Sequence, residues 1–202
     1  MISTLLRWSA FSLMAAFGLL GSLFVAGETL VDPGGWEAVA LVALWLVPMV
    51  FLCALAVRRI DTAHRVLVAA VTVLAALWVW FALAPGWWRS LMDERGPVLA
   101  IASFAVGVAV AFLGLRRPGT AGALLVVMAA VPVVASAVAA AVLDADRPDP
   151  AGLLGGSSTA AAIPTLVVGV LFLLSYAAER GQTRPDGHRS DVSDLGPART
   201  GR

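Results

Sequence analysis

Four carboxylates are the residues of this chain best placed to do chemistry. Glu28 and Glu37 each adjoin the end of a long apolar stretch, and Asp93 and Glu94 lie together in a later polar loop. Paired carboxylates can act as general acid and base, and an aromatic ring beside them can help to bind a cation. Tryptophans at positions 36, 87 and 88 accompany them. The four carboxylates are therefore a candidate ligand or catalytic site, although acidic, tryptophan-rich loops are also typical of a membrane-boundary anchor.

Other patterns with a known chemistry are missing from the sequence. Cys53, Asp61 and His64 lie near one polar turn, but a metal site needs three or four ligands at close spacing. We therefore expect Asp61 and His64 to be solvated turn residues, with no metal site. The chain has no P-loop lysine after Gly155-Gly156 and no H-E-x-x-H or G-x-S-x-G motif. We expect no cofactor, and a non-enzymatic protein more readily than an enzyme.

Composition places the chain in a membrane. Of its 202 residues 60% are hydrophobic and only 13% are charged, whereas soluble domains have about 25% charged residues. The apolar residues form blocks of about 18 or more, the length that a helix needs to cross the hydrocarbon layer. The sequence thus predicts an all-α, polytopic membrane protein with six transmembrane helices in a bundle. All fourteen basic residues are arginine, which is typical of GC-rich bacterial genomes.

The predicted transmembrane domain covers residues 1–178. A tail over 179–202, rich in Arg, Asp, Gly and Pro, is predicted to be disordered because it has too few apolar residues to fold. Pro48 and Pro132 fall in mid-span, where each removes a backbone hydrogen bond, so both are candidate helix breaks. We interpret the first stretch as a span rather than a cleaved signal peptide, because its apolar run exceeds the usual length; cleavage stays open. The predicted spans are 8–26, 38–57, 66–84, 98–115, 120–143 and 159–178.

The arginines predict how the chain is threaded. Six spans make the loops alternate between two sides, and three arginines fall on one side: Arg89, Arg95 and Arg147. The positive-inside rule places the more basic side in the cytoplasm. We therefore predict a multi-pass protein of the cell membrane with both termini cytoplasmic. The other eleven arginines are on that side: Arg7, Arg58, Arg59, Arg65, Arg116, Arg117, Arg180, Arg184, Arg189, Arg199 and Arg202.

Two short sequence patterns each occur twice in the chain, and they suggest different internal repeats. Residues 58–63 and 116–121 share the pattern Arg-Arg-x-x-Thr-Ala, which would suit a repeated helical hairpin. Val-Pro pairs at 47–48 and 131–132 would suit an inverted repeat. The two registers conflict, and the sequence leaves both open. Small residues at 103, 107, 111 and 114 form a stripe that favours close packing within the chain, with a dimer interface as the alternative.

No Asp, Glu, Lys, Arg or His lies inside the six predicted spans, which argues against an ion-coupled carrier. The leading hypothesis is a non-enzymatic helical membrane module or accessory subunit. Its partners would be the lipid bilayer, another membrane protein or a second copy of the chain. The net charge of +1 gives no reason to expect nucleic acid. The alternative is a small permease or transport-complex subunit that uses Pro48 and Pro132, and the third hypothesis is a membrane enzyme that uses the extracytoplasmic carboxylates.

Overall fold

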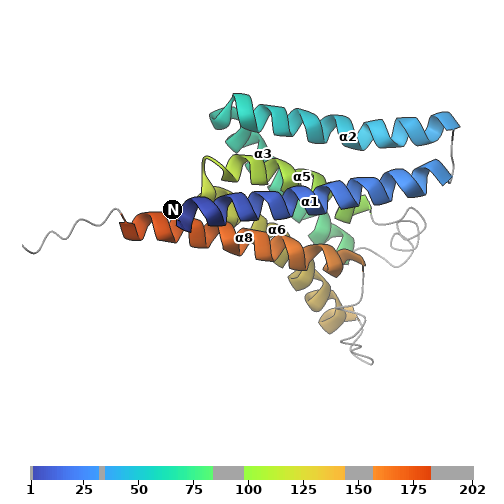
Figure 1. Cartoon of the computed structure of the whole chain (residues 1–202). Helices are drawn as coiled ribbons and strands as arrows, with labels where there is room; N and C mark the ends of the chain where they lie inside the picture. The colour runs from blue at the N-terminus through green and yellow to red at the C-terminus, as the bar shows by residue number, and fades with distance from the viewer. Residues whose placement is uncertain (1, 32–34, 84–97, 144–156, 183–202) are drawn as a thin grey trace, which may run out of the picture.

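The structure, a computed structural model, describes residues 2–31, 35–83, 98–143 and 157–182. Within these ranges every residue is α-helical except Arg59 and residues 115–117, and there is no strand (Figure 1). The all-helical class predicted from the sequence is confirmed. The helices are α1 (Ile2–Val31), α2 (Gly35–Arg58), α3 (Ile60–Leu83), α5 (Val98–Gly114), α6 (Pro118–Leu143) and α8 (Ser157–Gln182).

Several of these helices are long and apolar enough to cross a membrane. Among the described residues five segments meet that condition, and α5 contributes a shorter apolar segment, Ile101–Gly114. Their length and composition are compatible with a membrane location, because about 20 apolar residues span the hydrocarbon layer. The five segments are Ile2–Leu23, Gly35–Arg58, Ile60–Trp80, Pro118–Ala135 and Ala162–Gly181.

The helices extend further than the apolar stretches that predicted them. α1 continues to Val31, through the start of the polar loop expected after position 27. α8 continues to Gln182, so the first four residues of the predicted tail are helical, and positions 183–202 lie outside the described residues. Hydropathy marks where a chain leaves the hydrocarbon, whereas a helix ends where its backbone hydrogen bonds end.

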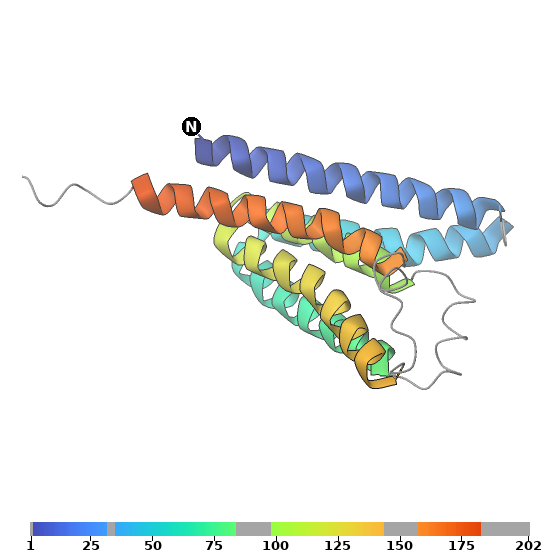
Figure 2. The same ribbon diagram turned by 90° about the horizontal axis from the view of Figure 1, so that it is seen from below.

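Both ends of the described chain lie at one end of the bundle. Figure 1 places the start of α1 and the end of α8 beside the two reversals, α2 to α3 and α5 to α6. We call this the hinge end, defined by Arg7, Arg59, Arg117 and Glu179. Figure 2 shows α3 and α6 side by side and inclined to α1 and α8.

α5 is the central helix of the bundle. It contacts each of the other described helices. Its residues Ala109, Val110, Ala111 and Leu113 have no exposed surface. A helix with so many small side chains can be surrounded closely, because its neighbours approach its backbone. Trp78 of α3 adds a polar contact to this core, since its indole N–H donates to the Ser103 hydroxyl at 3.3 Å.

Glycines close the interface between α6 and α8. A Cβ atom on Gly122 would lie 2.9 Å from the carbonyl oxygen of Gly169 and 2.8 Å from Leu173 Cγ. A Cβ on Gly169 would lie 3.0 Å from the backbone nitrogen of Val126. Real Cβ atoms essentially never come closer than 3.0 Å to such neighbours. The two backbones can therefore approach this closely only because both positions lack a side chain.

Glycines also allow close packing between α1, α5 and α8. Gly18 of α1 lies against Val108, and Gly107 of α5 lies against Met14. The ring of Phe172 covers Gly114, so that an added Cβ would lie 2.5 Å from Phe172 Cε1. The small-residue stripe of α5 thus packs within the chain, which confirms the first of the two interpretations of that stripe.

α2 lies at the edge of the bundle. Of its described side chains Ala56 alone is buried, whereas Trp36, Leu44 and Phe51 are 84%, 75% and 64% exposed. One polar contact holds it to the core, because the indole N–H of Trp45 donates to the Ile101 carbonyl at 3.3 Å. α2 therefore offers a long apolar face that no other described part of the chain covers.

Candidate functional site

The predicted carboxylate site lies mostly outside what the structure describes. Glu37 is exposed in the first turn of α2. Glu28 belongs to the last turns of α1, but its side chain is not among the described ones, and Asp93 and Glu94 are outside the described residues altogether. The convergence of these four carboxylates stays a prediction.

The two mid-span prolines have different surroundings. Pro48 is exposed in α2, whereas Pro132 is buried in α6, and the helix continues on both sides of each. Whether either one breaks its helix functionally stays a prediction. The buried proline follows Val131, a residue that lines two hollows between α3 and α6.

Those hollows are almost entirely apolar. One has a volume of about 290 Å³ and the other about 650 Å³. Among the lining residues only Thr72 and Trp80 have a polar group in the side chain, and the Thr72 hydroxyl donates to the Val68 carbonyl of its own helix at 2.9 Å. Such hollows suit hydrocarbon rather than a polar solute. The lining residues are Thr72, Ala75, Ala76, Val79, Trp80, Leu83, Ala130, Val131, Val134, Ala135 and Val138.

The two reversals at the hinge end share two backbone hydrogen bonds, although α2 runs to Arg58 whereas α5 ends at Gly114. The N–H of Arg59 donates to the Leu55 carbonyl at 2.8 Å, and the Arg59 carbonyl accepts from Ala63 at 2.8 Å. Arg117 repeats both bonds, with the Leu113 carbonyl at 2.8 Å and the Ala121 N–H at 3.1 Å. The sequence predicts a polar turn over 58–65, but the reversal is confined to Arg59. The matching bonds favour the register of the repeated hairpin.

Two ion pairs tie the helices together at the hinge end. Arg117 donates to the Asp61 carboxylate at 2.6 Å and so joins the two reversals. The guanidinium of Arg7 donates both to Glu179 of α8 and to the Leu115 carbonyl, the latter at 3.0 Å. The Arg7 and Glu179 side chains are 21% and 39% exposed, against 40% and 76% for Arg117 and Asp61. The Arg7 pair is therefore the better shielded of the two.

Aromatic rings from several helices also contact one another and an arginine near this end of the bundle. Phe11 makes edge-on contacts with Trp8 and with Phe112, at centroid distances of 5.8 and 4.8 Å. On the other side Tyr176 lies over Gly119, and the guanidinium of Arg180 lies 4.5 Å from the Tyr176 ring centroid. Aromatic contacts therefore join α1 to α5 and α6 to α8 at this end of the bundle.

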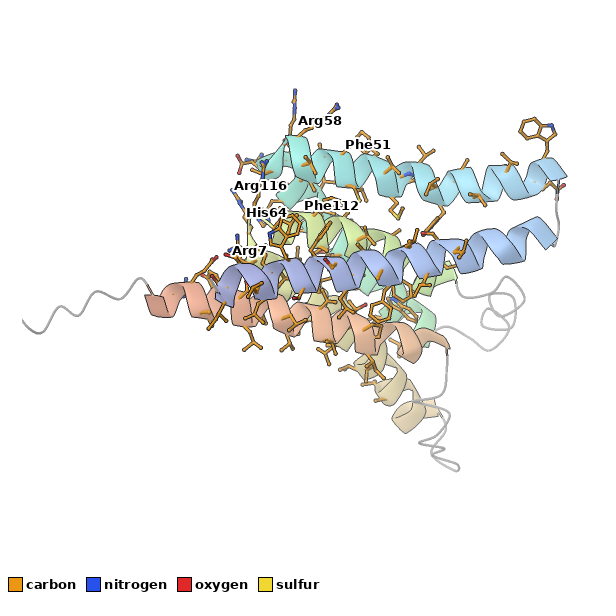
Figure 3. The ribbon with its side chains drawn as sticks, in the orientation of Figure 1. Arg7, Phe51, Arg58, His64, Phe112 and Arg116 are labelled. Atoms are coloured by element: carbon orange, nitrogen blue, oxygen red, sulfur yellow. The ribbon has the colours of Figure 1, made fainter. Side chains whose placement is uncertain are left out.

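Four further arginines at the hinge end are exposed to solvent: Arg58, Arg59, Arg65 and Arg116. Figure 3 shows Arg58 extending away from the bundle and Arg116 at the same end, with His64 and Arg7. We call the four exposed arginines, Arg58, Arg59, Arg65 and Arg116, the hinge-end arginine cluster.

His64 differs from the expected solvated turn residue. It is half-buried, and its Nδ1 atom is buried without a hydrogen-bond partner in the described part of the chain. Arg7 Nε and Ser175 Oγ share that condition. Asp61 is 76% exposed, as expected, but it is held by Arg117. Among the described residues no three His, Cys, Asp or Glu side chains come together as metal ligands would.

Sequence reasoning missed the ion pairs of the hinge end. Asp61 and Arg117 are 56 positions apart, and Arg7 and Glu179 are 172 apart. The available signal was the position of Asp61 and Glu179, two acidic residues on the arginine-rich side of the predicted topology. Acidic residues there are candidates to neutralise a neighbouring arginine.

The described chain defines an all-helical protein whose apolar helices could span a membrane. Comparisons with protein-family models, curated proteins and solved structures each gave no match.

Proposed function

We propose that this protein is a non-enzymatic helical module of the cell membrane that acts as an accessory subunit for a membrane partner. In this proposal the chain crosses the membrane six times, with the hinge end and both termini in the cytoplasm. Eleven arginines on that side against three on the other support the orientation. The start of α1 and the end of α8 at one end of the bundle agree with an even number of spans (Figure 1).

The observation that carries the proposal is the apolar, glycine-closed interior. Close contacts such as Gly122 against Gly169 fill the space between helices. The side chains that line the hollows beside Pro132 carry two polar groups, the Thr72 hydroxyl, which already donates to its own helix, and the indole N–H of Trp80. A transport site normally presents unsatisfied polar groups near the midplane. A bundle built in this way is better suited to packing against another protein.

α2 is the surface by which a partner would dock. Its exposed residues Leu44, Phe51 and Arg58 are spaced by seven positions, which places them on one face. Helices associate in membranes through such packing surfaces. A neighbouring transmembrane helix is therefore the partner that we propose for this face.

A small permease or transport-complex subunit remains the second candidate. The hollows between α3 and α6 lie beside the buried Pro132 and would admit an apolar solute. The third, an enzyme that uses Glu28, Glu37, Asp93 and Glu94, depends on the convergence of those carboxylates.

The test is purification of the full chain from native membranes in a mild detergent, followed by mass spectrometry of everything that stays bound. We expect a stoichiometric membrane protein. A variant with Leu44→Ala and Phe51→Ala should lose that partner, whereas the control Val73→Ala, an exposed change on α3, should retain it. A chain that comes out alone would overturn the accessory role and direct attention to the hollows.

A further inference from the structure

The hinge-end arginine cluster carries an excess of positive charge. The two arginine-rich segments around the reversals, residues 58–65 and 116–119, contain five arginines and one aspartate, which is five minus one or four net positive charges. The described acidic residues at this end are Asp61 and Glu179, and each already accepts from an arginine. Arg58, Arg59, Arg65 and Arg116 are exposed in addition to these pairs.

An exposed apolar face continues from the cluster along α2. Leu44 and Phe51 lie fourteen and seven positions before Arg58, on the same side of the helix. Both apolar side chains are mostly exposed, at 75% and 64%. A phospholipid has a charged headgroup joined to apolar acyl chains. The arginine could contact the headgroup, and the apolar residues next to it could contact an acyl chain.

We infer that the hinge-end arginine cluster binds the headgroup phosphate of an anionic phospholipid, whose acyl chain lies along Leu44 and Phe51 of α2. The inference rests on the membrane placement proposed above. Guanidinium groups bind phosphate oxygens in a planar, two-pronged geometry. Basic residues at a membrane surface attract anionic lipids, each by a factor of about five.

A lipid fits this surface better than a soluble anion does. A free phosphate would use the arginines alone and would leave the adjoining apolar stripe without a role. A lipid uses both, because its phosphate is joined to its acyl chains at the boundary where Val57, 49% exposed, meets Arg58. Leu44 and Phe51 are also the residues that the accessory-subunit proposal gives to the partner helix, so the lipid and the partner compete for this face of α2, and lipid binding is measured on the chain without its partner.

The experiment is native mass spectrometry of the full chain in detergent, titrated separately with phosphatidylglycerol and phosphatidylcholine. The wild type should bind phosphatidylglycerol at least about tenfold more tightly, because the arginines attract its net negative charge, whereas the choline of phosphatidylcholine offsets its phosphate. A variant with glutamine at 58, 59, 65 and 116 should bind the two lipids within about twofold of each other. The matching lysine variant should keep only part of the preference, because it retains the charge but loses the two-pronged guanidinium contact.

A matched control removes the same charge elsewhere on the same predicted side. Glutamine at 184, 189, 199 and 202 also takes away four arginines, and each variant still leaves seven of the eleven. This tail variant should keep the wild-type preference. Equal losses in the two variants would mean unspecific attraction and would overturn the site. Displacement of the lipid by inorganic phosphate at the same concentration would also overturn it, because the apolar stripe would then contribute nothing.

Failure of the inference can be told apart from failure of the proposed function. Lipid preference in detergent does not depend on which side of a membrane the cluster faces or on a protein partner. A wild type without preference for phosphatidylglycerol overturns the lipid site and leaves the accessory role standing. The glutamine variant should melt at the same temperature as the wild type, because all four replaced side chains are exposed. Equal melting temperatures would show that a lost lipid preference does not result from misfolding.

Discussion

Gly122 of α6 and Gly169 of α8 face each other so closely that a Cβ on the first would lie 2.9 Å from the carbonyl oxygen of the second. Neither position has room for a methyl group unless the backbones separate. Between α6 and α8 the packing is therefore decided by the absence of side chains. This matters in a bilayer, where lipid tails are as apolar as the helices and tight packing replaces the hydrophobic effect as the cause of association.

Alanine at either glycine should destabilise the protein. We expect Gly122→Ala and Gly169→Ala each to lower the free energy of unfolding by about 1–3 kcal/mol, the usual cost of overpacking. The control is Gly181→Ala in the same helix α8, where an added Cβ meets no atom within 4 Å. It should be neutral or stabilising by up to about 1 kcal/mol, since alanine is the better helix former. Denaturant-induced unfolding in mixed micelles measures all three, and equal stabilities would contradict the packing argument.

The two ion pairs of the hinge end should contribute unequally. In double-mutant cycles with glutamine and asparagine replacements, the Arg7–Glu179 pair should show a coupling of about 1–2 kcal/mol because it is partly buried. The Asp61 and Arg117 side chains are 76% and 40% exposed. The coupling energy between them should therefore be about 0–1 kcal/mol. Each pair is the control for the other in unfolding measurements.

Added salt gives a second readout of the same difference. Exposed charges are screened, whereas shielded ones are screened much less. The coupling between Asp61 and Arg117 should therefore vanish at high salt, and that between Arg7 and Glu179 should persist. The reverse order would show that the burial of Arg7 does not protect its pair.

Much of the helix layout follows from the sequence, because an apolar block of sufficient length has one stable structure in a membrane. Among the described residues, each predicted span corresponds mainly to one helix of the structure. What the sequence cannot supply is which surfaces meet. Glycine stripes occur in α1, α5, α6 and α8, and nothing local says that Gly107 meets Met14 or that Gly114 meets Phe172.

The candidate sites were less predictable than the fold. The carboxylates were chosen by residue type and by their position beside helix ends and tryptophans, and only Glu37 has a described side chain. By contrast, the sequence does contain the repeated Arg-Arg-x-x-Thr-Ala pattern, and its two copies form matching reversals at Arg59 and Arg117. The pairing of Asp61 with Arg117 was not predictable, because it requires the two hairpins to lie side by side.

The threading of the chain can be tested with its single native thiol removed. On a Cys53→Ala background, Ser90→Cys should react with a membrane-impermeant maleimide in intact cells. Thr62→Cys and Ser190→Cys should react only after the membrane is permeabilised, because both are predicted to be cytoplasmic. Gel shift after labelling reads out all three, with the cysteine-free background as control. Labelling of the cysteines at 90 and 190 together in intact cells would mean an even number of crossings after α3, whereas the six-span proposal requires three.

Two adjacent alanines of α6 should respond oppositely to the same enlargement. Ala129 is 2% exposed and packed in the core, whereas Ala130 is exposed and lines the hollow of about 290 Å³ beside α3. Ala129→Leu should lower the free energy of unfolding by about 1–3 kcal/mol, because a well-packed core has no room for added methyl groups. Ala130→Leu should be neutral or stabilising, since its side chain can enter the hollow and contact apolar residues of α3. The two variants have the same composition and differ by one helical position, so their melting temperatures in detergent compare core with hollow directly. A destabilised Ala130→Leu variant would show that the space between α3 and α6 is closed in solution, and would also remove the ground for an apolar transport site there.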